Sequence, residues 1–599
     1  MRIKKYIPQL ISGAVLSLIP LAVGNQYLSH VFSIFYLYVI MAIGLTIVVS
    51  YAGLLDLGYV AFFAVGAYLY ALLNTTFNLH FLMAIPLAAM SAAIFGVIIG
   101  FPTLRVRGDY LALVTLAFGE MIHTILINWT TVTNGPKGIY AIKSPNILGV
   151  QLSTPGRYYY VVFGCVVISV ILLYRLSGSP VALIWESLRD DEVAAKASGV
   201  NPQKYYLMAF AIGASFAGLV GVLFASIQRF VSPESFVLDE SILVLSIVVL
   251  SGGKSVLRIF IAATVFYLIP ELLRGFKEYR LLIFGGFLVV FPIYEYRINS
   301  LVLLIKKRMG YFLEDLTHAN TEVYDEYTNG NYCPSVVNGE KAFLRVHGVS
   351  KNYYGLMALK NISFDKLLSS NITALIGPNG AGKTTLFNCL SGIERFSEGS
   401  ISFGAIDNTI KLPAFVLAAN GIARTFQNVR LFRTMDVFQN ILIGCFCGKK
   451  IPFWSALCGT KKYKTFMAEC NRKADYYVNM LGLLPVRKDK VGNLPFGLQR
   501  KVEMARALAV EPKLLLLDEV VSGLNDAEKK EIAAILRRIT KELGVSMLIV
   551  EHDMPFVLGL AEHVIVLDSG VIIAEGAPEE VSNNKKVIEA YLGEAYANG

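Results

Sequence analysis

A glycine-rich stretch, GPNGAGKT, runs from Gly377 to Thr384 and matches the spacing G-x-x-x-x-G-K-[ST] in full. Glycines at these positions let backbone N–H groups converge on phosphate oxygens. The ammonium of Lys383 would neutralise the outer phosphates, and the hydroxyl of Thr384 would be a ligand for Mg²⁺. A strand-forming run precedes the stretch and a helix-forming run follows it, which is the context that this loop requires. The predicted phosphate-binding residues are Gly377, Pro378, Asn379, Gly380, Ala381, Gly382, Lys383, Thr384 and Thr385.

Two adjacent carboxylates follow a second apolar run, KLLLLDE, far downstream. The four leucines predict a buried strand of a parallel sheet. Asp518 would lie at the carboxyl end of this strand, where it can hold Mg²⁺, and Glu519 would act as general base on an attacking water. A buried strand followed by a turn carboxylate is common, so this pair gains its meaning from the phosphate loop.

The elements that must position these residues lie in the second half of the chain only. Of the 599 residues, 55% are hydrophobic and 16% are charged, but apolar runs dominate up to about residue 300. A membrane-spanning helix needs about 20 mostly apolar residues. We expect ten such helices, the eighth of them short enough to be a half-span or re-entrant segment. They lie near 6–23, 28–50, 56–74, 79–101, 109–128, 158–176, 205–227, 240–253, 258–273 and 281–298.

The chain therefore divides into a membrane domain over 1–308, a polar linker over 309–342 and an α/β nucleotide-binding domain over 343–599. The first apolar run is interpreted as a membrane helix and not as a removed signal, because no small-residue cleavage site follows it. The net charge of +10 is attributed to basic cytoplasmic loops rather than to nucleic-acid binding. No basic cluster is interleaved with stacking aromatic residues, as single-strand binders require. The seven cysteines lack metal-site spacing, which favours free thiols in the cytoplasm.

Ionisable residues also fall within or at the ends of the predicted spans. Such groups are costly in lipid, so they should face the interior of the bundle or a wet cavity. A substrate path is one interpretation, and buried structural hydrogen bonding or a position at the membrane edge is the other. These residues are Asp56, Asp109, Glu120, His123 and Glu271.

Further motifs between and after these two groups resemble those of ATP-binding cassette (ABC) proteins. The segment NLPFGLQRKVEMARALAVEP is similar to the ABC signature, with residues 494–498 in place of LSGGQ. Gln427 resembles the Q-loop glutamine, residues 522–525 resemble the D-loop, and His552 resembles the switch histidine. Tyr353 stands where an aromatic ring stacks on adenine. The second half therefore resembles an α/β P-loop ABC ATPase over nearly all of 343–599.

The resemblance implies roles for individual residues. It implies that Glu519, His552 and Gln427 are catalytic, and that Gln427 joins Thr384 and Asp518 as a ligand of Mg²⁺. Two departures from the family pattern stand out. Pro495 replaces the signature serine and has no hydroxyl or N–H to donate, so that Gly497 and its neighbouring backbone must carry the nucleotide contact. Val520 stands where most ABC proteins have a proline after the catalytic glutamate.

The membrane half resembles a narrower group. The stretches GLTIVVSYAGLLDLGYVAFFAVGAYLYALL, LRVRGDYLALVTLAFGE and FVSPESFVLDESILVLSIVVLSGG are similar to the LivM-type permease of branched-chain amino acid importers. The ATPase half is similar to the LivG-type subunit, so the chain resembles a fusion of the two. This resemblance implies ATP-driven import of branched-chain, hydrophobic amino acids across the inner membrane, with ATP and Mg²⁺ as cofactors. The implied partners are a second permease, a second ATPase, a periplasmic substrate-binding protein and membrane lipid, but no nucleic acid.

Several alternatives remain open. Related permeases handle urea and short amides, and the binding protein, not this chain, chooses the cargo. An ABC exporter or ATP-gated channel has a similar domain order, and a regulatory ATPase without transport is disfavoured by the intact spans. The implied localisation is the inner membrane, multi-pass, with the ATPase domain in the cytoplasm.

A charged segment, WESLRDDEVAAKASG, interrupts the apolar half at Trp185 to Gly199. In the resembling importers a short coupling helix in such a loop docks in a groove of the ATPase near the Q-loop. We expect the same here, with Glu186 and Arg189 among the docking residues. The alternative is an ordinary solvated loop helix.

Overall fold

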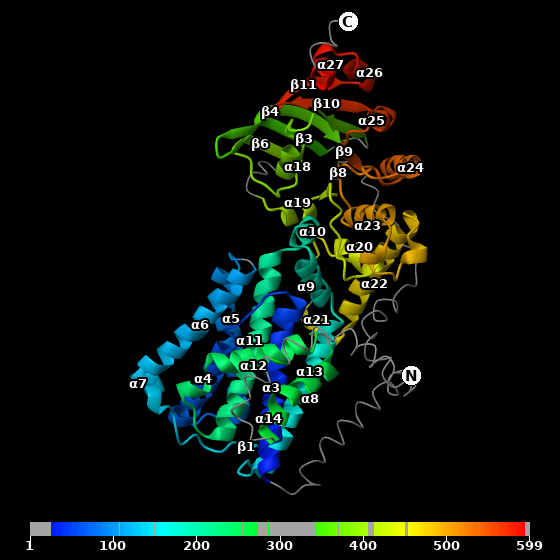
Figure 1. Ribbon diagram of the computed structural model, residues 1–599. Helices are drawn as coiled ribbons and strands as arrows, with labels where there is room; N and C mark the ends of the chain where they lie inside the picture. Colours follow the sequence, from blue (N-terminus) through cyan, green and yellow to red (C-terminus); the bar gives the residue numbers. More distant parts are fainter. Residues whose placement is uncertain are drawn as a thin grey trace. The chain divides into compact units, whose positions relative to one another are not determined.

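The computed structural model describes residues 26–106, 108–147, 150–253, 255–272, 286, 342–368, 371–404, 412–449 and 453–592 (Figure 1). The chain forms two compact units. The first comprises 1–189 and 203–323, and the second comprises 190–202 and 324–599. The predicted helices at 6–23 and 281–298, except residue 286, and the linker at 309–342, except Ala342, lie outside the described residues.

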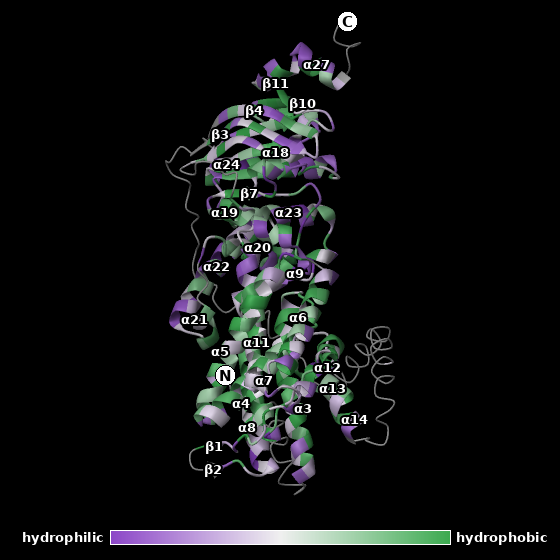
Figure 2. Cartoon of the chain, turned by 90° about the vertical axis from the view of Figure 1, so that its left-hand side faces the viewer, coloured by the Kyte–Doolittle hydropathy of each residue, from purple (hydrophilic) through white to green (hydrophobic). Residues whose placement is uncertain are grey.

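Within its described residues, the first unit contains six helices that are long and apolar enough to cross a membrane. Figure 2 shows their mostly hydrophobic character as green ribbon. They are α3 (Gln26–Thr46, continued by the π-helical turn η1, Ile47–Tyr51), α4 (Val60–Phe77), α5 (Phe81–Thr103), α6 (Asp109–Asn128), α8 (Pro155–Ser177) and α11 (Pro202–Gln228). Each matches one predicted span to within a few residues.

The predicted count of about ten spans is not confirmed. The segment at 240–253 forms α12 (Leu238–Leu250), which is about 20 Å long at 1.5 Å per residue and therefore shorter than the hydrocarbon core. The segment at 258–273 is divided among α13 (Val256–Ala263), the π-helical turn η4 (Thr264–Leu268) and α14 (Ile269–Leu272). The remaining elements of this unit are α7 (Thr130–Thr133), η2 (Gly135–Lys137), β1 (Asn146–Ile147), β2 (Val150–Gln151), α9 (Pro180–Asp190) and η3 (Pro233–Ser235).

Small residues allow α11 to pack closely against its neighbours. A Cβ atom on Gly66 of α4 would lie 2.4 Å from the backbone oxygen of Gly218. A Cβ atom on Gly218 would lie 2.6 Å from the backbone oxygen of Ala88 in α5. Because lipid supplies no hydrophobic drive between helices, such close backbone approach is how membrane helices gain packing energy.

The second unit contains a six-stranded sheet in the order β11-β10-β5-β9-β8-β7. All neighbouring pairs are parallel except β10 with β11. The strands are β5 (Ile372–Ile376), β7 (Ile422–Arg424), β8 (Leu514–Asp518), β9 (Ser546–Val550), β10 (His563–Asp568) and β11 (Val571–Gly576). As predicted, the leucine run at 514–517 is a fully buried parallel strand, which explains why it is apolar without alternation.

An antiparallel sheet of three strands and a set of helices complete this α/β unit. The three strands, in the order β4-β3-β6, are β3 (Ala342–Tyr353), β4 (Leu356–Leu368) and β6 (Glu398–Phe403). Hydrophobic residues from both sheets and from α18 form one core. The helices are α18 (Lys383–Leu390), α19 (Ala414–Ala419), α20 (Val437–Cys445), α21 (Phe453–Cys458), α22 (Lys461–Met480), η7 (Leu484–Val486), η8 (Val491–Asn493), α23 (Phe496–Leu508), α24 (Asp526–Leu543), α25 (Met554–Leu560), α26 (Pro578–Ser582) and α27 (Lys585–Leu592).

The segment 190–202 contains α10 (Glu192–Ala197) and packs with this second unit, although it lies between α9 and α11 in the sequence. The predicted single helix over 185–199 is therefore two helices. Asp191 separates them because its side chain accepts the Ala194 N–H and caps α10.

Candidate nucleotide site

The predicted phosphate loop joins β5 to the first turn of α18. Gly377 and Gly382 have φ values of +152° and +99°, which side-chain-bearing residues rarely adopt. A Cβ atom on Gly377 would lie 2.0 Å from the backbone oxygen of Leu567 in β10. Asn379 and Gly380 are exposed at the tip, Pro378 is half-buried and Ala381 is buried. Thr384 and Thr385 follow in α18, Thr384 with an exposed side chain. The loop therefore presents its tip and the start of α18 to solvent.

Lys383 is the buried cation of this loop. Its Nζ atom donates hydrogen bonds to the backbone oxygens of Gly377 at 2.6 Å and Pro378 at 2.9 Å. Burial lowers the pKa of the ammonium, while the nearby carboxylates of Glu519 and Asp518 oppose that shift. The lysine is thus held inside the loop, where phosphate oxygens can replace the two carbonyls as its partners.

Asp518 ends β8 and forms a buried ion pair with Arg424 of β7 at 2.8 Å. Arg424 also donates hydrogen bonds to Asn388 Oδ1 at 2.7 Å and Ser391 Oγ at 2.9 Å. The other carboxylate oxygen of Asp518 is buried without a hydrogen-bond partner among the described residues. Burial raises the pKa of Asp518, and the guanidinium of Arg424 acts in the opposite direction. One oxygen is therefore held by Arg424 and the other remains available for a ligand.

Replacing Arg424 with alanine should destabilise the second unit strongly. Removing one partner of a buried ion pair leaves an uncompensated charge and costs about 3–5 kcal/mol. We expect a clearly lower melting temperature of the purified protein, followed by calorimetry. Arg538→Ala is the control, because its pair with Glu542 on α24 is exposed and should matter little. Equal melting temperatures for the Arg424 and Arg538 variants would contradict a structural role for the buried pair.

Three predicted catalytic side chains meet at one carboxylate oxygen. Gln427 Nε2 donates to Glu519 Oε1 at 3.0 Å, and His552 Nε2 lies 3.4 Å from the same atom. Glu519 has a φ of +48°, an unusual conformation for a residue with a side chain, and its N–H donates to the backbone oxygen of Val550 at 2.8 Å. Strained backbone of this kind clusters at functional sites.

Helix α23, which we call the signature helix because it contains residues 496–498 of the signature, holds the segment that carries Gln427. Arg500 donates to the backbone oxygens of Phe426 and Gln427, and Glu503 accepts the N–H groups of Phe426 and Arg430 at 3.3 and 3.2 Å. Arg500 and Glu503 are both buried and pair with each other at 3.2 Å. These two residues and Arg424 were not among the site residues predicted from the sequence. Charged side chains at helical spacing within the signature segment were the available signal.

Tyr353 and the signature residues occupy separate positions in the second unit. Tyr353 ends β3, its hydroxyl donates to Glu394, and burial and this carboxylate raise its pKa to about 12. Pro495 is the N-cap residue of α23, and Gly497 lies in the first turn of that helix. A Cβ atom on Gly497 would lie 2.7 Å from Oε1 at the end of the flexible Glu528 side chain.

Val520 stands in the turn after Glu519, where most ABC proteins have a proline, and a side chain holds this turn instead. The buried carboxylate of Glu551 accepts the N–H of Val521 at 2.8 Å. Burial raises the pKa of Glu551 to about 7. A proline at Val520 is therefore not needed to fix this turn.

These features define the class of protein: an ATP-binding cassette joined to a helical membrane unit. They are the phosphate loop, the carboxylates after a buried strand, and the glutamine and histidine that meet at Glu519. Residues 27–292 match the family described as "Branched-chain amino acid transport system / permease component". Residues 359–522 match "ABC transporter", and residues 571–597 match "Branched-chain amino acid ATP-binding cassette transporter". The chain belongs to the family of branched-chain amino acid ABC transporters, and its second half is an ABC ATPase.

Individual relatives match each half separately. The permease protein LivM of Escherichia coli (strain K12) is 42% identical over 282 residues, covering 43% of this chain and 66% of LivM, just under two thirds. The ATP-binding protein LivG of Salmonella typhimurium is 38% identical over 252 residues, covering 42% of this chain and 98% of LivG. The solved structure of MJ1267, an ATP-binding cassette of an ABC transporter in its ADP conformation, is 32% identical. It aligns with 42% of this chain and 99% of its own, with a TM-score of 0.36.

Proposed function

We propose that this chain is the fused permease and ATPase subunit of an importer that uses ATP hydrolysis to move branched-chain amino acids across the inner membrane. The observation that carries this is the meeting of Gln427 and His552 at Glu519 in a chain whose two halves match the permease and the ATPase. Import of urea or short amides is the second candidate, because in the proposed assembly a separate binding protein delivers the cargo. An exporter or channel is the third, since fused domains are common in exporters.

In this proposal Glu519 accepts the proton of the attacking water, and Gln427 and His552 orient that carboxylate and the outer phosphate. Tyr353 stacks on adenine, the loop from Gly377 to Thr385 holds the phosphates, and Gly497 contacts nucleotide on an opposing ATPase. Magnesium, when bound, neutralises phosphate charge. The orphaned buried oxygen of Asp518 and the exposed hydroxyl of Thr384 are hard oxygen ligands of the kind that Mg²⁺ prefers, with Gln427 as the third.

The proposed assembly contains a second permease, a second ATPase and a periplasmic binding protein. One phosphate loop and one signature form each sandwiched site, so a single ATPase unit is incomplete. The ATPase then lies on the cytoplasmic side, where ATP is found. The test is uptake by reconstituted assembly: labelled leucine should enter vesicles only with ATP on the ATPase side and with a loaded binding protein. Uptake of urea without leucine, or export, would select the other candidates.

We further propose that the segment 190–202 couples the two functions. Asp190 Oδ2 accepts hydrogen bonds from the Thr434 N–H at 3.0 Å and the Thr434 hydroxyl at 2.7 Å. Asp191 pairs with Arg430 at 3.0 Å. Arg430 lies three residues after Gln427, and Glu503 of α23 accepts its N–H, so contacts run from α10 through the Q-loop to the signature helix.

The expected docking residues Glu186 and Arg189 have other surroundings. Arg189 donates to the backbone oxygen of Ser50 within the first unit, and its side chain packs on Gly53, where a Cβ atom would lie 2.4 Å from it. Glu186 acts electrostatically on Tyr51 of the same unit. Both lie before Asp190, in the part of the segment that belongs to the first unit, so their docking on the ATPase stays a prediction.

The double variant Asp190→Ala with Asp191→Asn should uncouple transport from hydrolysis. Asparagine still caps α10 but loses its charge, so the helix should persist while its contacts with Thr434 and Arg430 weaken. Each lost contact is worth about 1 kcal/mol and up to three are weakened, so we expect leucine uptake per ATP to fall by at least about tenfold. Glu192→Gln is the matched control, since Glu192 pairs with Lys196 within α10. Uptake per ATP that is equal in the double variant and the control would count against coupling through this segment.

A further inference from the structure

Helix α6 carries a charged residue in the middle of a membrane span. In the six spans that the structure describes, the other charged residues are Asp109, Arg157, Arg175 and Lys204, and each lies within three residues of a helix end. Glu120 lies eleven residues after Asp109 and eight before Asn128, the two ends of α6. A carboxylate at this position cannot reach the membrane surface by extending its short side chain.

The side chain of Glu120 is exposed in the first unit. An ionised carboxylate is costly in hydrocarbon, so this face of α6 must meet water or a polar group and not lipid. Thr124 and Asn128 follow at i+4 and i+8 and are exposed as well. Because residues four apart share one face of a helix, these three side chains form a polar stripe along the second half of α6. We call it the α6 polar stripe.

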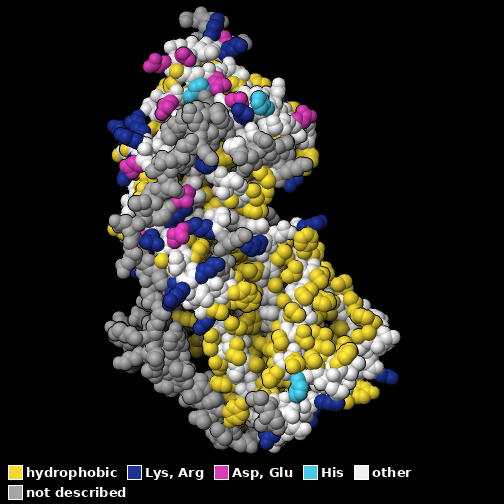
Figure 3. Space-filling model, turned by 180° about the vertical axis from the view of Figure 1, so that it is seen from behind, with side chains coloured by type: hydrophobic (Ala, Val, Ile, Leu, Met, Phe, Trp, Pro, Cys, Tyr) yellow, Lys and Arg dark blue, Asp and Glu magenta, His cyan; other side chains and the backbone are white. Residues whose placement is uncertain are grey.

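Other exposed helix faces of this unit have the opposite character. The exposed residues in the middle of α5 include Met90, Ile94 and Ile98, and those of α8 include Ile168 and Ile171. Figure 3 shows one face of the first unit on which hydrophobic side chains form a nearly continuous cover. Such surfaces suit lipid tails. The α6 polar stripe therefore differs from these exposed faces of α5 and α8, although Met121 and Ile125 of α6 are exposed beside it.

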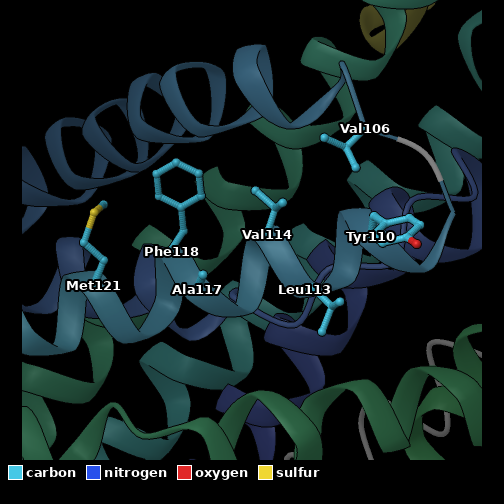
Figure 4. Close-up of a pocket in the computed structure, with 7 residues that line it drawn as sticks. All are labelled: Val106, Tyr110, Leu113, Val114, Ala117, Phe118 and Met121. Carbon is cyan, nitrogen blue, oxygen red and sulfur yellow. The ribbon is translucent and has the colours of Figure 1, made fainter.

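An apolar groove lies along the first half of the same helix. It has a volume of about 370 Å³ and is largely open to the surface. Figure 4 shows Val114, Phe118 and Met121 projecting from one side of α6 into this groove. Glu120 directly precedes Met121 in the helix. The groove is lined by Val106, Tyr110, Leu113, Val114, Ala117, Phe118 and Met121.

We propose that this face of α6 lines the transport path, with Glu120 binding the ammonium group of an aliphatic amino acid while the apolar groove receives its side chain. A carboxylate beside an apolar surface is complementary to a cationic group that carries a short hydrocarbon chain. Charge-assisted hydrogen bonds between ammonium and carboxylate are also stronger than neutral ones. The inference rests on the proposed import of branched-chain amino acids and assigns a residue for it.

The first experiment compares leucine uptake by the complete reconstituted assembly carrying Glu120→Gln with that of the parent assembly. The parent is measured first, because an assembly that moves no amino acid refutes the proposed function and not this residue's role. Given uptake by the parent, the glutamine variant should have a KM for leucine at least tenfold higher, and Glu120→Asp should recover part of the difference. Asp109→Asn is the control: it removes an exposed carboxylate from the same helix three turns away, at the membrane edge. An unchanged KM in the glutamine variant overturns the proposal.

The second experiment remains informative if the glutamine variant assembles poorly. The background is a chain in which all seven native cysteines are replaced by alanine and which still takes up leucine. A single cysteine is placed at Thr124 or at Asn128 of this chain. Each variant is then treated with a charged, membrane-impermeant thiol reagent. They should react, and excess leucine should slow the reaction. Cysteines at Met90 or Ile94 of α5 should not react in the same preparation. Unreactive cysteines at both stripe positions would mean that another subunit or lipid covers this face, and would overturn the proposal.

Discussion

Lys383→Ala is expected to abolish ATP hydrolysis while leaving the protein able to insert and fold. The ammonium is the cation of the phosphate loop, and its loss removes charge stabilisation where the transferred phosphoryl group becomes more negative. Removing one preorganised stabiliser of this kind typically costs about 10²–10³ in kcat. Alanine is a strong helix former, so the first turn of α18 should persist. The measurement is phosphate release by purified protein at saturating ATP.

Two controls separate the chemical role of Lys383 from its structural one. Because Nζ also holds the carbonyls of Gly377 and Pro378, melting curves should be recorded for the variant, and its fold should be intact at the assay temperature. Lys360→Ala removes an exposed lysine from β4 and should leave hydrolysis at the parental rate. Parental turnover by the Lys383 variant would refute the phosphate-loop assignment.

Glu519→Gln is expected to slow hydrolysis by about 10²-fold or more while ATP binding persists. The amide oxygen can still accept the hydrogen bond from Gln427, so the geometry of the cluster should survive, but it cannot take the proton of the attacking water. ATP that binds without being hydrolysed should hold two ATPase units together, so the variant should elute as a larger species when ATP is present.

Because His552 lies close to Glu519, a variant of His552 tests which of the two residues is the general base. His552 lies 3.4 Å from the same carboxylate oxygen. His552→Ala should reduce hydrolysis less than Glu519→Gln if the glutamate is the base. An unchanged rate in the glutamine variant, with a large loss in the alanine variant, would move the role of base to the histidine.

The parts of the site that could be predicted are those whose residues lie close together in the sequence. The phosphate loop lies within one strand, one loop and one helix, so its spacing alone specifies Gly377 to Thr384. Glu519 follows a buried leucine run, and the phosphate loop elsewhere in the chain gave that common pattern its meaning. Arg424 was missed because its contact with Asp518 joins residues 94 positions apart, and nothing in the sequence around either residue indicates the pairing.

The membrane unit was predicted best where apolar runs are long and uninterrupted. The span at 109–128 has the predicted bounds, and the other five described spans differ by a few residues. At 240–253 the helix is short, as predicted: α12 ends at Leu250, just before the left-handed glycines Gly252 and Gly253. The break between α9 and α10 was missed, although the capping preference of Asp191 was a readable signal for a new helix start.

The segment 190–202 means that the chain leaves the membrane unit, contributes to the ATPase unit, returns, and leaves again at residue 324. The two units are thus joined covalently at three points in one polypeptide. For two separate proteins, the fraction paired would depend on how much of each the cell makes. In a single chain the partner's effective concentration is fixed by the tether, in the millimolar range for short flexible linkers. Matched expression of permease and ATPase is therefore guaranteed at translation, and a cell producing this protein cannot accumulate a permease that lacks its ATPase.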